Sequence, residues 1–375
     1  MRERIYSIDA VRAVAMAFIV AIHADLFRGL GATGNAVNLV IDTVGRFAVP
    51  FFFLTSGYLF ARKCTRTEPA AYVRAHLERV GSIYGYAVLG YFPLVLLVAA
   101  GGTARAGGDV SSAVLARALE ALSPLGLLYY GDSVLLFLWF LPSLAISIAL
   151  VYAVVAVEKT RYLLPVAATF HVVGILDQSY PMLVDVPFVT RDALFFGFFY
   201  TSVGYCIGSW QWSPSRDRSG LYLAATVTFG AIHLAERYVL GYVLTGDSIA
   251  QGVYVTKYTA TTPLFATALF VYVLSRPTLG KGTGLPWLGS HAVWIYVVHP
   301  LVLFSLVGVS GAVELLGYDL GESALWHVAL STLTYAGALA ISLFLTRTTL
   351  LRRASRVTSR DRLRTVVNAM VGGRN

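Results

Sequence analysis

The stretch Asp9-AVRAVAMAFIVAIH-Ala24 decides the fold, because it is an apolar run of helical length that carries Arg12 and His23. A charge and a titratable imidazole inside a membrane span are costly and by default mark function. An eleven-residue step at 100° per residue returns to nearly the same helix face, about 20° off, and rises about 16 Å. One helix therefore presents a cation near one membrane surface and an imidazole deeper in.

The composition is that of a polytopic membrane protein. Of 375 residues, 57% are hydrophobic and 13% charged, whereas soluble domains carry about 25% charged residues. The mean hydropathy is +0.68. Cys64 and Cys206 stand in no C-x-x-C spacing, so we expect neither a disulfide framework nor a metal site. Nucleic acid is not an expected partner, because the net charge of +9 lies at the membrane edges.

The hydropathy pattern predicts an all-α protein with about ten transmembrane helices. We expect one membrane domain over 1–346 and a basic cytoplasmic tail over 347–375 that lies on anionic lipid. The apolar stretch 110–130 contains Ser123-Pro124 and is predicted to be interfacial or re-entrant. The predicted spans are 9–28, 38–61, 80–100, 134–156, 163–177, 191–210, 219–240, 257–275, 286–306 and 325–346.

Lys and Arg placement predicts the orientation of these spans. Most of the 29 Lys and Arg residues fall in alternate loops and in the two terminal segments, while acidic residues cluster in the opposite loops. Both termini are therefore predicted to be cytoplasmic. In that orientation Arg12 lies near the cytoplasmic face and His23 in the outer half of the membrane.

The polar residues of the spans then sort into two layers. A cytoplasmic cationic layer beside an outer polar layer suggests a conduit that binds an anion from inside and does chemistry or recognition nearer the outside. The inner layer is Arg12, Ser56, Gly57 and the basic run with Arg62, Lys63 and Arg66, and the outer layer is His23, Asp42, Arg46, Glu236, Arg237, Lys257 and His299, with Trp139.

Structural roles compete with functional ones at each of these positions. Arg12 could be a positive-inside anchor that snorkels to the interface, and His23 an interhelical hydrogen-bonding group. His299 precedes Pro300, so its imidazole could cap backbone groups freed by the proline; we favour this role over a chemical one. Trp139 could equally belong to an aromatic belt.

The remaining polar positions have comparable alternatives. Asp42 and Arg46 form an i,i+4 pair that could be purely structural. Glu236 and Arg237 could lie at the membrane interface at little cost, and Lys257 is most simply an interfacial anchor. The basic run 62–66 is commonly a topology determinant alone.

Several motifs together resemble the acyltransferase-3 family of membrane acyltransferases. Arg12 and His23 match its R-x10-H motif, and Phe51-Phe52-Phe53-Leu54-Thr55-Ser56-Gly57-Tyr58 resembles its F-F-x-[IL]-S-G-[FY] segment with Thr55 added. Lys63-Cys64-Thr65-Arg66 fits the R-x-x-R motif only as K-x-x-R. Leu138-Trp139-Phe140-Leu141 resembles a W-F-L element, and Trp287-Leu288-Gly289-Ser290 through Ile295-Tyr296-Val297-Val298-His299-Pro300 resembles the late L-G…Y-x-x-H-P element.

The resemblance implies a ten-helix enzyme of the cell membrane that moves an acyl group, usually acetyl, from cytoplasmic acyl-CoA to a hydroxyl of a glycan or lipid-linked sugar. No permanently bound cofactor or metal is implied. His23 is expected to act as general base or as transient acyl carrier, with Arg12 on the transfer path. The expected donor-binding residues are Arg12, Ser56, Gly57, Arg62, Lys63 and Arg66, and the expected acceptor-binding residues are Trp139, Arg46, Glu236 and His299.

A proton-coupled transporter is the alternative, because two polar layers and an intramembrane acid at Glu236 would also suit a carrier. Against it, the sequence shows no inverted repeat. A purely structural scaffold accounts for neither Arg12 nor His23. The residues alone therefore lead to a membrane protein with a transfer or transport path, and the resemblance favours acyl transfer.

Overall fold

The computed structural model describes residues 4–65, 67–184, 186–210, 213–254 and 256–347, and these residues contain helices and no strands, which confirms the predicted all-α class. The α-helices are α1 (Tyr6–His23), α2 (Gly31–Gly45), α3 (Ala48–Cys64), α4 (Pro69–Arg105), α5 (Val110–Ala121), α6 (Phe140–Ala156), α7 (Leu163–Ser179), α8 (Phe198–Ser209), α9 (Ser219–Tyr238), α10 (Thr262–Ser275), α11 (Leu285–Ser290), α12 (Ala292–Glu314) and α13 (Ala324–Arg347).

Each of the ten predicted ranges contains a helix. Within the described residues, six segments are long and apolar enough to cross a membrane, and two shorter apolar helices, 193–209 and 262–275, accompany them. The number ten and the orientation of the termini stay predictions. The six segments are Tyr6–His23, Gly31–Cys64, Pro69–Arg105, Leu136–Ala156, Ala292–Glu314 and Ala324–Leu345.

Several predicted span boundaries differ from the helix ends, and two of these differences bear on the candidate site. The first span was expected to reach residue 28, but α1 ends at His23. Asp25 and Phe27 adopt left-handed conformations with φ of 47° and 65°, which a right-handed helix cannot continue. The eighth span was expected to begin at Lys257, but α10 begins at Thr262, so Lys257 lies in the preceding loop.

The second predicted span is a broken helix. The segment Gly31–Cys64 is interrupted at Arg46 and Phe47, between α2 and α3. Pro50 lies four residues after Arg46 and cannot donate a backbone hydrogen bond to its carbonyl, which accounts for the interruption. The break brings Arg46 to the interior of the bundle.

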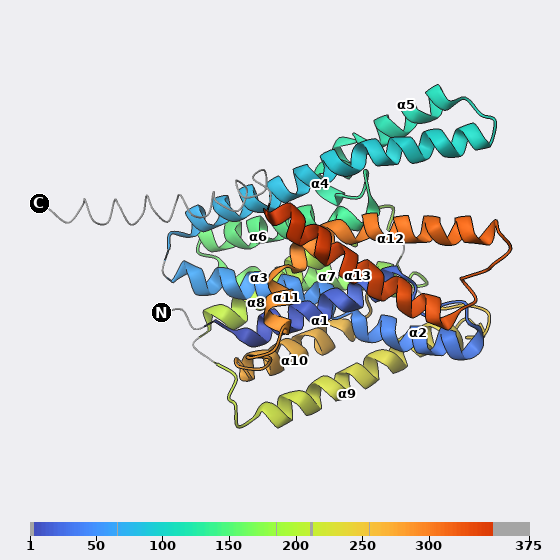
Figure 1. Cartoon of the computed structure of the whole chain (residues 1–375). Helices are drawn as coiled ribbons and strands as arrows, with labels where there is room; N and C mark the ends of the chain where they lie inside the picture. Colours follow the sequence, from blue (N-terminus) through green and yellow to red (C-terminus); the bar gives the residue numbers. More distant parts are fainter. Residues whose placement is uncertain (1–3, 66, 185, 211–212, 255, 348–375) are drawn as a thin grey trace, which may run out of the picture.

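The helices pack around α1, which lies near the middle of the molecule (Figure 1). In this view α9 runs along the lower edge and α4 along the upper edge. The stretch 110–130 forms α5 and a π-helical turn, Gly126–Tyr130, and α5 folds back along the end of α4.

Helices α3 and α8 make an especially close crossing. A Cβ added at Gly57 would overlap the carbonyl oxygen of Thr201, and one added at Gly204 would overlap that of Leu54. Only glycine permits such an approach of two backbones. This crossing holds the end of α3, with its basic residues, in place beside α1.

Candidate active site

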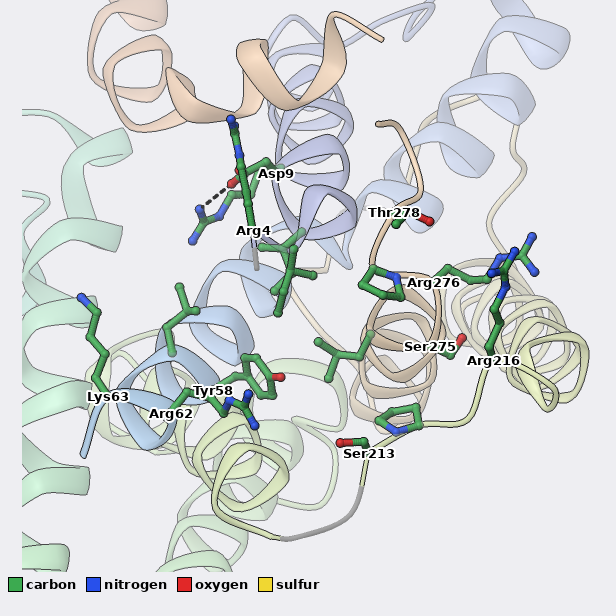
Figure 2. Close-up of a pocket in the computed structure, with 17 residues that line it drawn as sticks. Arg4, Asp9, Tyr58, Arg62, Lys63, Ser213, Arg216, Ser275, Arg276 and Thr278 are labelled. Atoms are coloured by element: carbon green, nitrogen blue, oxygen red, sulfur yellow. Dashed lines mark hydrogen bonds and ion pairs between the residues drawn. The ribbon is translucent and has the colours of Figure 1, made fainter. Parts of the chain in front are cut away.

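A large basic cavity lies where α1 begins and where α3 and α10 end. Its volume is about 1200 Å³, and Figure 2 shows its labelled cations arranged around one hollow. One carboxylate, that of Asp9, is among the lining residues described. The lining cations are Arg4, Arg12, Arg62, Lys63, Arg216 and Arg276.

Asp9 organises the α1 side of this cavity. Its Oδ1 accepts a hydrogen bond from Nη1 of Arg12 at 3.2 Å and its Oδ2 one from Nε of Arg4 at 2.8 Å. The Nε of Arg12 is buried and has no hydrogen-bond partner among the described residues. One carboxylate therefore orients two guanidinium groups and leaves the cavity strongly cationic.

The start of α1 is tied down by two other parts of the chain. The Ser7 hydroxyl donates to the carbonyl of Val273 at 2.8 Å, which fixes α1 to the end of α10. Helix α11 packs so closely on α1 that a Cβ at Gly289 would overlap the carbonyl oxygen of Asp9. This contact explains why the Trp287–Ser290 motif carries a glycine, and it fixes the position of Arg12.

Only some of the residues predicted to bind the donor are placed by the structure in the lining of the basic cavity. The Ser56 hydroxyl donates to the carbonyl of Phe52 within its own helix at 2.8 Å, and Gly57 faces α8 rather than the basic cavity. The close crossing with α8 accounts for the glycine. Arg66 lies outside the described residues. Arg12, Arg62 and Lys63 do line the cavity, and their role in donor binding stays a prediction.

A second, smaller cavity of about 80 Å³ lies beside the other end of α1, which forms part of its lining. Of the residues predicted in the outer layer, it brings together four, from four different segments of the chain. These are His23, Arg46, Trp139 and Lys257. Arg191, Tyr258 and Tyr296 complete its polar lining.

His299 of α12 is the partner that orients His23. The Nδ1 of His23 lies 2.8 Å from Nε2 of His299, and the two rings are stacked with centroids 5.1 Å apart. The Nδ1 of His299 lies 2.7 Å from the carbonyl oxygen of Tyr296. Pro300 leaves that carbonyl without its usual helical donor, so His299 does cap the proline break as its position suggested.

These contacts determine the tautomers of both rings when both are neutral. A carbonyl oxygen only accepts, so Nδ1 of His299 carries the proton and its Nε2 carries a lone pair. Nε2 of His299 must then accept from Nδ1–H of His23. The Nε2 of His23 is left with a lone pair, which is the form of a general base. The hydrogen bond by which His299 caps the proline break therefore also determines which nitrogen of His23 carries the lone pair.

Arg46 is held by a buried ionic network. Asp42 accepts from Arg46 at 3.1 Å and 2.5 Å and also from Arg237 of α9. Arg237 is 0% exposed, so its charge is enclosed by the protein. Its second amino group donates to the carbonyl of Thr256 at 2.9 Å. Asp42 therefore links α2 to α9 and aims Arg46 at the cavity.

Glu236 lies away from this cavity and binds a loop instead. Its carboxylate accepts from the Tyr180 and Thr259 hydroxyls, each at 2.5 Å, and from the backbone amides of Ala260 and Thr261, each at 3.0 Å. Both oxygens of this carboxylate already accept hydrogen bonds from the protein. A structural role in holding the loop before α10 accounts for it, and its predicted contact with an acceptor has no support in the geometry.

Arg191 is the site residue that the sequence did not single out. Its guanidinium carbon lies 4.8 Å from the centre of the Trp139 ring, which places it over that ring. One available signal was that Arg191 is among the few cations in the loops predicted to lie outside.

Within the described residues, no group of three or more His, Cys, Asp or Glu is arranged to hold a metal ion.

Comparison with known proteins bears on this geometry. A family model described as an acyltransferase domain matches residues 5–347. An amino-acid racemase of Enterococcus faecalis is 24% identical over 338 residues, which are 84% of this chain and 43% of the relative. A serine/alanine racemase of Enterococcus gallinarum is 26% identical over 325 residues, again 84% and 43% of the two chains.

The chain thus spans less than half the length of these relatives, and their names describe the whole proteins. No solved structure matches the chain. The family model covers nearly all of the chain, including both cavities and the helices that build them. The protein is therefore a helical membrane protein that belongs to the acyltransferase-3 family.

Proposed function

We propose that this protein is a membrane O-acyltransferase that moves an acyl group, such as acetyl, from acyl-CoA to a hydroxyl of an acceptor. The observation that carries this proposal is that one helix, α1, lines both cavities. Arg12 faces the large cationic cavity and His23 the small one. Arginine and lysine side chains suit phosphate groups, so the basic cavity suits the phosphates of CoA.

The transfer is a proton-coupled acyl exchange. Nε2 of His23 takes the proton of the acceptor hydroxyl, whose oxygen attacks the thioester carbonyl. The new C–O bond forms, the C–S bond breaks, and the departing CoA sulfur receives the proton from His23. In a variant of the scheme His23 attacks the thioester first, the C–S bond breaks with release of the CoA thiolate, and the acceptor hydroxyl then takes the acyl group from the acyl-imidazole while its proton passes to that thiolate.

The path between the two cavities passes tightly packed residues. Met16 of α1 and Phe51 and Leu54 of α3 lie between them along these helices, and all three are fully buried. The arm of the donor must therefore displace side chains to reach His23. Met16 is suited to such a movement because its side chain is unbranched and flexible.

Binding of acetyl-CoA tests the donor half of the proposal. Acetyl-CoA should raise the melting temperature of the purified protein, since a ligand that binds only the folded state stabilises it. Arg12→Ala should weaken this binding about 10- to 100-fold, because a charged hydrogen-bonding group contributes about 1.5–3 kcal/mol. Thermal shift against acetyl-CoA concentration measures both effects.

Arg161→Ala is the matched control, because Arg161 lies in another predicted cytoplasmic loop and stacks on Tyr162 with 4.6 Å from its guanidinium carbon to the ring centre. Its affinity for acetyl-CoA should remain that of the unmodified protein. A wild-type protein that acetyl-CoA does not stabilise would contradict the proposal and favour the transporter.

His299 is expected to act as a positioning residue through His23. His299→Ala should lower kcat about 10- to 100-fold, because it removes the acceptor that holds His23 in one tautomer. The KM for acetyl-CoA should not change, since the basic cavity lies about 16 Å away along α1. His299→Gln, whose amide can still accept from His23, should recover part of kcat.

Steady-state kinetics with acetyl-CoA as the varied substrate separates these parameters. A proportional rise in KM, or equal losses in the alanine and glutamine variants, would reduce His299 to a packing residue.

A further inference from the structure

The cavity at His23 is lined by three cations that come from separate segments. Arg46 lies at the break between α2 and α3, Arg191 in the loop before α8, and Lys257 in the loop before α10. The described lining of this cavity contains no carboxylate. General-base chemistry at His23 requires none of these charges, so their convergence calls for a separate explanation.

The positive charge is balanced only in part by the carboxylates around it. Asp42 is shared between Arg46 and the buried Arg237, so one carboxylate faces two guanidinium groups. Among the described residues, Arg191 and Lys257 have neither a hydrogen-bond nor an ion-pair partner, and Nε of Arg191 is buried. A buried donor without an acceptor is costly, so an anion would be stabilising at Nε of Arg191, beside the solvent-exposed charge of Lys257.

Neighbouring carboxylates make their hydrogen bonds to other groups and form no ion pair with Arg191 or Lys257 among the described residues. Asp192 accepts from the Tyr129 hydroxyl at 2.8 Å and from the backbone amide of Phe195 at 2.9 Å. Asp177 accepts from the Thr190 hydroxyl at 2.5 Å. Asp132 lies close enough to act electrostatically on Arg191 and Lys257, but it is not part of the described lining.

The loops that carry Arg191 and Lys257 are locked to each other. The Tyr258 hydroxyl donates to the carbonyl of Thr190 at 3.1 Å, and the Thr256 hydroxyl donates to that of Gln178 at 3.1 Å. The first bond joins the residue after Lys257 to the residue before Arg191, and the second ties the residue before Lys257 to the end of α7. The two cations are therefore presented by a built framework.

We propose that the acceptor carries an oxyanion, a carboxylate or a phosphate, close to the hydroxyl that is acylated, and that Arg191 and Lys257 bind it beside His23. This inference rests on the proposed acyl transfer. The volume of about 80 Å³ is that of a small cavity. That space suits one anionic end group, with Trp139 against it, and the rest of the acceptor extends outward past the exposed Lys257.

Three matched probes test the charge requirement. Glycerol, glycerate and glycerol 3-phosphate all offer hydroxyls and differ in carrying no anion, a carboxylate or a phosphate. Thermal shift of the purified full-length protein measures binding without any acyl transfer. Glycerate, glycerol 3-phosphate or both should stabilise the protein, glycerol should not, and the stronger of the two anions identifies the oxyanion.

Arg191→Gln and Lys257→Gln should each weaken binding of the effective anion about tenfold or more, because each removes a charge-assisted contact. Arg28→Gln is the matched control, since Arg28 is exposed and paired with Asp25 at 3.1 Å. Its anion affinity should remain unchanged. Size-exclusion profiles and melting temperatures without ligand show whether the variants fold. If a variant does not fold, the comparison of the three probes on the wild-type protein still tests the charge requirement.

The outcomes separate this inference from the proposed function. Equal stabilisation by glycerol, no stabilisation by either anion, or an equal loss in Arg28→Gln would overturn the anion site, even if acetyl-CoA is consumed with a neutral acceptor. Anion binding that depends on Arg191 and Lys257, in a protein that never releases CoA from acetyl-CoA, would support the anion site and contradict the acyltransferase.

Discussion

Replacing His23 with alanine is expected to lower acyl transfer by about 10²- to 10⁴-fold, the range that a positioned general base contributes. The reason is geometric: His23 is the residue of the small cavity whose neutral imidazole presents a lone pair at Nε2, because its Nδ1–H donates a hydrogen bond to Nε2 of His299 at 2.8 Å. Release of CoA from acetyl-CoA in the presence of an acceptor measures the rate.

Binding of the donor provides the control for this variant. The basic cavity lies about 16 Å from His23 along α1, so acetyl-CoA should stabilise the alanine variant as it does the wild-type protein. Near-normal turnover in His23→Ala would remove His23 from the mechanism. A variant that neither turns over nor binds acetyl-CoA would show a folding defect, and His23→Gln, which retains much of the volume, would then be measured instead.

Replacing Asp42 with asparagine is expected to cost about 3–5 kcal/mol of stability, which is the usual effect of removing one partner of a buried ion pair. Arg237 is 0% exposed, and Asp42 is its ion-pair partner within the described part of the chain. Asparagine keeps the shape of the side chain and removes its charge. Thermal or denaturant unfolding in detergent measures the loss.

The double variant Asp42→Asn/Arg237→Met separates the charge from the packing. It removes the fully buried one of the two cations that lose Asp42, Arg46 being the other, and keeps an apolar side chain of similar length, so part of the lost stability should return. Arg237→Met alone should cost less than Asp42→Asn, because Asp42 keeps its pair with Arg46 at 2.5 Å. An unchanged melting temperature in Asp42→Asn would show that the network contributes nothing to stability.

Local sequence was sufficient to predict the helices. Hydropathy over windows of span length placed a helix in each expected range, because burial of apolar side chains and internal backbone hydrogen bonds both depend on short segments. The errors fell at helix ends and at the break inside the second predicted span. Asp25 and Phe27 adopt left-handed conformations although neither is a glycine, and no local sequence pattern predicts such a turn.

The candidate site was predictable only in part. Arg12 and His23 stood out because polar residues are rare in an apolar run. The pairing of His23 with His299 joins residues 276 positions apart, and nothing in either segment indicates the other. Glu236 and Arg237 looked alike in the sequence as neighbours at a helix end, yet one caps a loop and the other is fully buried against Asp42.

Composition and hydropathy established a helical membrane protein, and the motifs around Arg12, His23 and His299 established its family resemblance, because these properties reside in short stretches of chain. Packing established which polar groups meet. Helices α1 and α12 bring the two imidazoles into contact, and the loops before α8 and α10 bring Arg191 and Lys257 to the same cavity. Hydrogen bonds and ion pairs act over a few ångströms in space, so residues far apart in sequence acquire their chemistry only when the helices assemble.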